Sequence, residues 1–184
     1  MMELNKYIEH TLLKQDATKS EVIKLLDEAK EYKFFGVCVN PINVKFAADY
    51  LNGSNVKVVT VVGFPLGQNT TESKVLETID AIKNGADEID MVLNAGKLRD
   101  GEFDFIIEEI SKIKSACQGK ALKVILETDL LSQEEITVII KDTLTELSLS
   151  SPVKKDKGKI MKVLMPKVKG KADGKLVNQL LDAH

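Results

Sequence analysis

The chain has 184 residues, of which 43% are hydrophobic and 29% are charged, so it is long enough to bury the core of one domain with or without a small appendage. No stretch approaches the ~18 consecutive apolar residues of a membrane-spanning helix, and the N-terminal segment, with Glu3, Lys6 and Glu9, lacks the apolar core of a signal peptide. We therefore expect a cytoplasmic protein that does not enter the membrane. The two cysteines, Cys38 and Cys117, form no metal-type cluster, so we expect free thiols and no bound metal or cofactor.

The net charge of −2 conceals an uneven distribution. The segment Lys154–Lys175 contains nine lysines against two aspartates and contributes +7, which leaves −9 on the remaining residues. Two interpretations stay open: a solvated lysine-rich face, or a surface that binds a polyanionic partner. The segment contains no arginine and no aromatic residue for base stacking, so its composition indicates at most non-specific polyanion binding.

From residue 18 to residue 128, helical periodicity alternates with short apolar runs. Thr18 followed by Glu21 forms a capping box at the start of a helix, and the run "VKVVTVV" (56–62) is typical of a strand buried on both faces. We expect strands at 36–39, 56–62, 88–93 and 122–128, with a fifth around "YIEHTLL" (7–13). We expect helices after Thr18, after Pro41, over about 71–84 and over 103–117, with a loop at 94–102. This alternation predicts an α/β domain with parallel strands.

The pattern changes at about residue 131. Ser132 and Glu135 form another capping box, and the apolar residues that follow recur at helical spacing in three segments. No β-rich run remains in this part of the sequence. We therefore predict two domains, an α/β domain over 1–130 and a small all-α unit over 131–184.

Five motifs of the first domain resemble a known family. In chain order they are "IEHTLLK", "GVCVNP", "VVTVVGFPLG", "NGADEIDMVLNAGKLRDGE" and "LKVILET", and together they are similar to the strand and loop motifs of deoxyribose-phosphate aldolases over residues 7–131. The resemblance implies a TIM barrel, here incomplete with about five parallel strands. It also implies a lyase that splits 2-deoxyribose 5-phosphate into glyceraldehyde 3-phosphate and acetaldehyde through a Schiff-base lysine.

The resemblance also implies a set of site residues. Asp90 lies within the apolar strand "EIDMV", where a carboxylate without a partner or a task would be costly, and it matches the family's proton-relaying catalytic aspartate. Cys38 and Asn40 correspond to positions that line the substrate pocket. Glu9 stands where the family usually has aspartate, and Lys123 is expected to face the barrel interior beside the substrate.

The nucleophile of the family has no counterpart in these 184 residues. The Schiff-base lysine belongs to a motif similar to "VKTSTG" on the sixth strand, and no such motif occurs here. We therefore expect the aldolase activity to be impaired. A full barrel takes ~250 residues, so the open edges of a five-stranded body should be covered by the C-terminal segment, by a second copy in a homo-oligomer, or by a complementing fragment.

The C-terminal segment resembles a different family. "MPKVKGKADGKLVNQL" is similar to the helical domain of the YqeY family, which is related to the tail of the B subunit of tRNA-dependent amidotransferases. The resemblance implies association with tRNA or another polyanion through Lys154–Lys175. A tRNA-associated module that carries an inactive half-barrel is therefore the alternative function, and a chain that joins two unrelated coding regions, by natural fusion or as an artefact, is a further interpretation.

Overall fold

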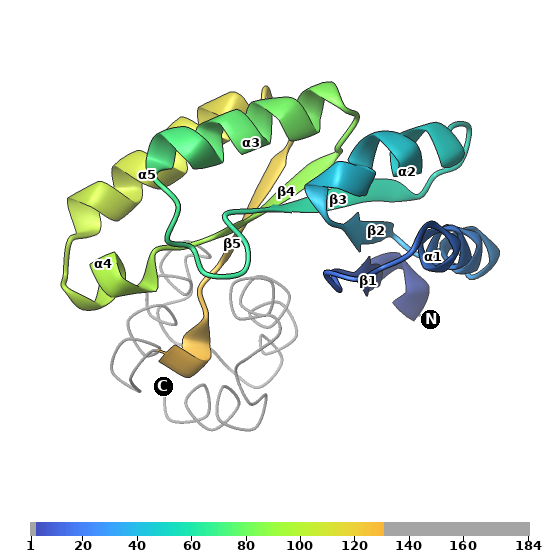
Figure 1. Cartoon of the computed structure of the whole chain (residues 1–184), viewed down its shortest axis with the longest axis horizontal. Helices are drawn as coiled ribbons and strands as arrows, with labels where there is room; N and C mark the ends of the chain where they lie inside the picture. The colour runs from blue at the N-terminus through green and yellow to red at the C-terminus, as the bar shows by residue number, and fades with distance from the viewer. Residues whose placement is uncertain (1–2, 131–184) are drawn as a thin grey trace.

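The computed structural model describes residues 3–130, which form one parallel sheet with helices along one side (Figure 1). The strand order is the chain order, β1-β2-β3-β4-β5, and every neighbouring pair is parallel. The strands are β1 (Glu9–Leu12), β2 (Gly36–Val39), β3 (Lys57–Val62), β4 (Glu88–Val92) and β5 (Ala121–Ile125). All five predicted strands are therefore confirmed, including the one around "YIEHTLL", and the α/β class with a partial barrel is correct.

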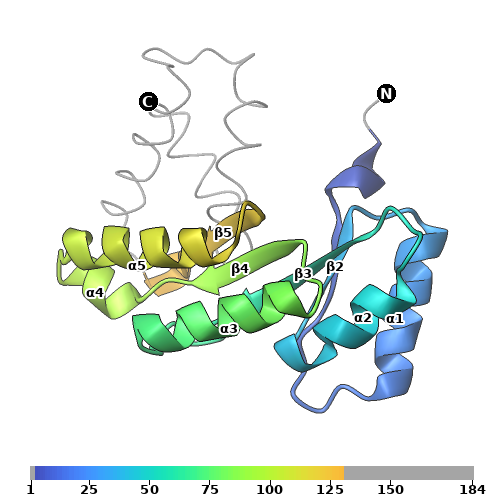
Figure 2. The same ribbon diagram turned by 90° about the horizontal axis from the view of Figure 1, so that it is seen from above.

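In the described residues, five α-helices follow the first four strands: α1 (Lys19–Glu31), α2 (Val44–Tyr50), α3 (Thr71–Lys83), α4 (Ala95–Arg99) and α5 (Phe103–Ala116). Three short helical turns are η1 (Leu4–Tyr7) before β1, η2 (Pro41–Asn43) before α2 and η3 (Thr128–Leu130) after β5. Helices α1, α2, α3 and α5 cover the side of the sheet that we call the outer face. Helices α3 and α5 pack against each other (Figure 2). Within residues 3–130, no helix combines the length and apolar character needed to cross a bilayer.

One predicted element is wrong. The loop expected at 94–102 contains the short helix α4, whose first turn is capped by the Asn94 side chain accepting a hydrogen bond from the Lys97 backbone N–H at 3.1 Å. A helix of five residues carries too few apolar positions to show a helical period in the sequence. Its cap, an asparagine, is equally common in turns, so the sequence pattern did not separate the two.

Side chains alternate across the sheet, and the two faces differ in chemistry. Val37 and Val39 of β2 and Ile89 and Met91 of β4 point to the outer face, where they join the main hydrophobic core with residues of α1, α2, α3 and α5. On the opposite face, which we call the inner face, Cys38 belongs to a separate small cluster with two valines of β3 and Leu13. The main hydrophobic core thus lies between the sheet and the helices, and the inner face carries a smaller apolar cluster.

The capping box at Thr18 is present as predicted. The Thr18 hydroxyl accepts from the Glu21 backbone N–H at 3.3 Å, and the Glu21 carboxylate accepts from the Thr18 backbone N–H at 2.7 Å. We expect Thr18→Ala to lower the free energy of unfolding by about 1 kcal/mol in urea denaturation, because the Glu21 backbone N–H loses its acceptor. Thr18→Ser keeps the hydroxyl and is the matched control; an equal loss in both variants would contradict the capping role.

Candidate active site

A cluster of one lysine and three carboxylates lies on the inner face. The Lys123 ammonium is 2.5 Å from Glu9 Oε1, 2.9 Å from Asp90 Oδ1 and 3.4 Å from Glu88 Oε2. The four side chains come from three strands, β1, β4 and β5, and all are mostly buried, with Lys123 23% exposed. The structure thus brings together three of the predicted site residues, Glu9, Asp90 and Lys123, on the inner face, and their roles remain predictions.

The strand register places these residues. Glu88 and Asp90 are two apart on β4 and so point to the same face, and Lys123 of β5 is the direct neighbour of Asp90 in the parallel pairing. Side chains two residues apart on one strand, and side chains of directly paired residues on neighbouring parallel strands, lie on the same face of the sheet. The contact between β4 and β5 therefore follows from the sheet pairing alone.

The contact of Lys123 with Glu9 requires curvature as well. β1 and β5 are the two outermost strands of the described sheet, and in a flat sheet four strand spacings of about 4.8 Å would separate them by about 19 Å. A lysine and a glutamate side chain do not bridge that distance. Their hydrogen bond therefore shows that the sheet curls toward closure, as the strands of a barrel do.

The electrostatics of the cluster keep Lys123 charged. Burial by itself lowers the pKa of Lys123, but the negative charge of Asp90 and the hydrogen bond and charge of Glu9 outweigh burial and raise the pKa well above its ordinary value. An amine acts as a nucleophile only in its neutral form. Lys123 is therefore suited to hold and orient carboxylates, and unsuited to form an imine at neutral pH.

The other two predicted site residues lie on and after β2. Cys38 is buried on the inner face, where it packs with Val59 and Val61. Asn40 directly follows β2 and precedes the turn η2 at Pro41. Cys38 thus lies on β2 and Asn40 just after it, whereas Asp90 and Lys123 lie on β4 and β5. The roles of Cys38 and Asn40 in binding remain predictions.

The sequence prediction missed Glu88. Its carboxylate is 3.4 Å from the Lys123 ammonium and adds a third negative charge, which gives the cluster a formal charge of −2. The signal was available, because Glu88 and Asp90 alternate with Ile89 and Met91 along one strand. A cluster with this excess of negative charge favours a further cationic group in its neighbourhood.

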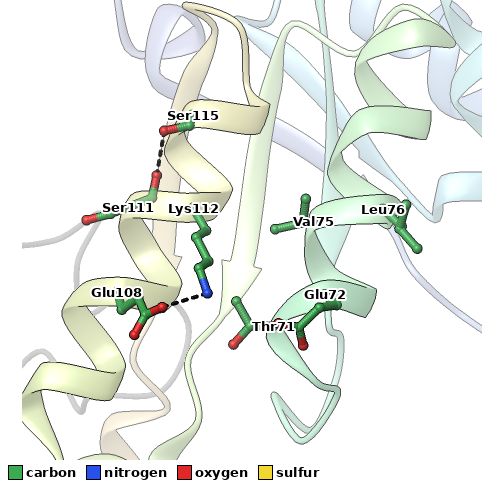
Figure 3. Close-up of a pocket in the computed structure, with 8 residues that line it drawn as sticks. All are labelled: Thr71, Glu72, Val75, Leu76, Glu108, Ser111, Lys112 and Ser115. Atoms are coloured by element: carbon green, nitrogen blue, oxygen red, sulfur yellow. Dashed lines mark hydrogen bonds and ion pairs between the residues drawn. The ribbon is translucent and has the colours of Figure 1, made fainter.

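A groove of about 660 Å³ lies elsewhere, between α3 and α5 on the outer face (Figure 3). Val75 of α3 points toward α5 in this view, and on α5 the Lys112 ammonium pairs with Glu108 at 2.6 Å. Neither Asp90 nor Lys123 lines this groove. The candidate active site is therefore the inner-face cluster, and the groove is a separate surface feature.

A curled parallel sheet with helices outside and a lysine–carboxylate cluster inside defines an α/β protein of the barrel type with a polar interior. Comparison with known proteins shows the family to which the chain belongs. Residues 4–146 match the DeoC/LacD family of aldolases, and the chain belongs to that family.

Individual relatives agree with this assignment. A deoxyribose-phosphate aldolase of Staphylococcus haemolyticus is 54% identical over 134 residues, which cover 73% of this chain and 61% of the relative. A deoxyribose-phosphate aldolase of Metamycoplasma hominis is 50% identical over 151 residues, covering 82% of this chain and 67% of the relative. The chain thus spans about 61% of the length of the first of these curated relatives.

Solved structures show the same architecture. The structure described as "QR15, an Aldolase" matches with a TM-score of 0.74 and 28% identity, covering 100% of this chain and 89% of the other. The tetrameric deoxyribose phosphate aldolase of Aeropyrum pernix matches with a TM-score of 0.65 and 29% identity, covering 76% of this chain and 59% of the other.

The predicted second domain lies outside the described residues. The family match extends to residue 146 and so crosses the boundary predicted at residue 131. The YqeY-like unit over 131–184 and the lysine-rich segment Lys154–Lys175 remain predictions from sequence.

Proposed function

We propose that the chain is a deoxyribose-phosphate aldolase-type lyase in which Asp90 moves protons and Lys123 positions it. The observation that carries the proposal is the 2.9 Å contact between Asp90 and the Lys123 ammonium on the inner face of a family member. The proposed reaction splits 2-deoxyribose 5-phosphate, the substrate class indicated by the names of the relatives.

The chemistry needs a group that transfers protons at the bond that breaks. In a retro-aldol cleavage the substrate hydroxyl loses a proton while the carbon–carbon bond opens, and the carbon fragment that stays on the amine later gains one. A carboxylate within hydrogen-bond reach of the reacting atoms performs both transfers. Asp90 fits this role because Lys123 and the curled sheet fix its position on the inner face, and Glu9 holds Lys123 from the opposite edge.

The nucleophilic amine is a different lysine from Lys123, because Lys123 stays protonated in its carboxylate cluster. The sequence contains no "VKTSTG"-like motif, so we expect imine formation by this chain to be slow. The test is incubation of the full chain at high concentration with 2-deoxyribose 5-phosphate and borohydride, followed by mapping of the mass-shifted lysine. We expect a low yield of adduct on a lysine other than Lys123. Absence of any adduct would refute the aldolase function, and an adduct on Lys123 would refute its positioning role.

Asp90→Asn tests the proton relay. We expect the rate of 2-deoxyribose 5-phosphate cleavage to fall by about 10²- to 10⁴-fold, because the amide has no basic oxygen to accept the proton. The matched control is Asp87→Asn, three residues earlier, whose carboxylate pairs with Lys57 and Lys120 near the surface. Equal cleavage rates in wild type and Asp90→Asn would contradict the role of Asp90.

A second candidate function is binding of tRNA or another polyanion, and the +7 charge of Lys154–Lys175 favours it. Filter binding with tRNA at two salt concentrations tests this function. We expect affinity to fall steeply as salt rises, since lysines that neutralise phosphates release counterions. Binding that is absent, or unchanged by salt, would remove this candidate and leave the aldolase function untouched.

A further inference from the structure

A second lysine–carboxylate pair is fully buried under the helices, away from the inner-face cluster. Lys74 of α3 and Glu109 of α5 are 0% exposed in their side chains, and the ammonium lies 3.0 Å from Glu109 Oε2. The remaining Glu109 oxygen accepts from the Thr71 hydroxyl at 3.3 Å. Buried ion pairs add little net stability compared with apolar side chains of similar volume, so the presence of this one calls for a separate explanation.

The ammonium of Lys74 reaches beyond its partner to the sheet. It donates a hydrogen bond of 3.0 Å to the backbone oxygen of Val92, the last residue of β4. Val92 lies two residues after Asp90 on the same strand. A side chain from α3 thus binds the end of β4, the strand that carries Asp90, the proposed proton-relay residue.

The stem of Lys74 fixes the end of β3 as well. Gly63 directly follows β3 with a φ of +65°, and a Cβ at this position would lie 2.9 Å from Cε of Lys74. Because Gly63 has no Cβ, it leaves room for the aliphatic part of the Lys74 side chain. One turn further along α3, the Glu77 carboxylate accepts a hydrogen bond of 2.9 Å from the Gly63 backbone N–H.

The loops that follow β3 and β4 are joined directly to each other. Gly67 donates its backbone N–H to the oxygen of Gly63 at 2.8 Å, and its backbone packs so closely on Leu93 that a Cβ would lie 2.1 Å from the Leu93 oxygen. Gln68 and Asn94 add a side-chain hydrogen bond of 3.3 Å between the two loops. Residues 63–68 and 93–94 therefore form one unit, which we call the rim.

We infer that Lys74 is a positioning residue that fixes this rim above the inner-face site, by filling the space at Gly63 and binding Val92 while Glu109 holds its ammonium. The groups that react in such barrels project from the C-terminal ends of the strands, where the rim lies. An apolar pair in place of Lys74 and Glu109 would fill the core equally well but would donate no hydrogen bond to Val92. The catalytic consequence of this role rests on the proposed function, whereas the geometric role does not.

The test is amide hydrogen exchange of the full chain without substrate, in wild type and in Lys74→Met/Glu109→Leu. We expect the double variant to keep its cooperative unfolding, while the amides of Gly63, Gly67 and Leu93 exchange about tenfold faster or more, because the rim opens without its anchor. The control is Lys112→Met/Glu108→Leu, which removes the exposed Lys112–Glu108 pair on α5 and should leave these three amides unchanged.

If the folded variant Lys74→Met/Glu109→Leu exchanges these three rim amides as slowly as wild type does, the inference is wrong. Lys74→Gln/Glu109→Gln, which keeps a polar pair but shortens the side chain at position 74, covers the case in which the apolar variant does not fold, and the same faster exchange is expected. If the aldolase assay gives cleavage, we expect either double variant to raise KM several-fold more than it lowers kcat, because the rim lies at the C-terminal strand ends, where barrels of this type bind their substrates. Failure of the proposed function would abolish cleavage in wild type and leave the exchange result standing.

Discussion

Glu109→Leu is expected to lower the free energy of unfolding by about 3–5 kcal/mol, because it leaves the Lys74 ammonium buried without a counter-charge. The bond to the Val92 oxygen remains, but a neutral carbonyl does not compensate for removing a charge from water. Urea denaturation followed by circular dichroism measures the loss. A drop of this size is a large fraction of the 5–15 kcal/mol that stabilises an ordinary domain, so partial unfolding at 37 °C is also expected.

Two controls separate charge burial from loss of packing. Adding Lys74→Met to Glu109→Leu removes the stranded ammonium and should recover most of the stability, since buried ion pairs are replaced by apolar pairs at little net cost. Glu108→Leu, one residue earlier on α5, removes an exposed partner of Lys112 and should change stability little. Equal losses in Glu109→Leu and in the double variant would show that packing, and not the charge, sets the cost.

Local sequence patterns accounted for most of the fold. The capping box of Thr18 and Glu21, and the apolar run that became β3, act over a few residues and need no tertiary information. The order of the strands followed from the alternation of strands and helices, since parallel neighbours are joined by helical crossovers. The helix α4 was missed because a single turn has no period to detect.

The site was only partly visible in the sequence, for two different physical reasons. Asp90 stood out as a carboxylate in an apolar strand, but Glu9 is 114 residues from its partner Lys123 and meets it only because the sheet curls. Lys74 was missed because a lysine in an amphipathic helix is normally assigned to the solvent side. Its spacing from the buried residues Thr71 and Thr78 places it on the buried stripe of α3, and that was the available signal.

Lys123 and Lys74 therefore have separate tasks on opposite faces of β4. Lys123 holds the carboxylates of the inner face, where reacting groups would be oriented, and Lys74 holds the strand end from the outer face. Asp90 and Val92 lie two residues apart on β4 between them. A substitution at either lysine should consequently disturb β4, but through different contacts.

Lys123→Met is expected to lower the free energy of unfolding by about 2–3 kcal/mol at pH 7, less than a fully buried pair because water reaches part of the cluster. The variant leaves Glu9, Glu88 and Asp90 facing one another without their cation. Lys120→Met is the matched control: Lys120 lies three residues earlier and forms an exposed pair with Asp87, so little change is expected.

The pH dependence distinguishes a charge effect from lost packing. The pKa of Lys123 is raised in the folded chain above its unfolded value of about 10.4, so its contribution is fully present below that pH and is lost as pH rises through the folded pKa. The stability difference between wild type and Lys123→Met should therefore stay constant from pH 7 to about pH 10 and narrow at higher pH. If the stability difference between wild type and Lys123→Met stays constant up to the highest pH at which the chain folds, Lys123 acts by packing alone. A narrowing that begins near neutral pH would mean that the amine loses its proton there, and Lys123 would then become a candidate nucleophile.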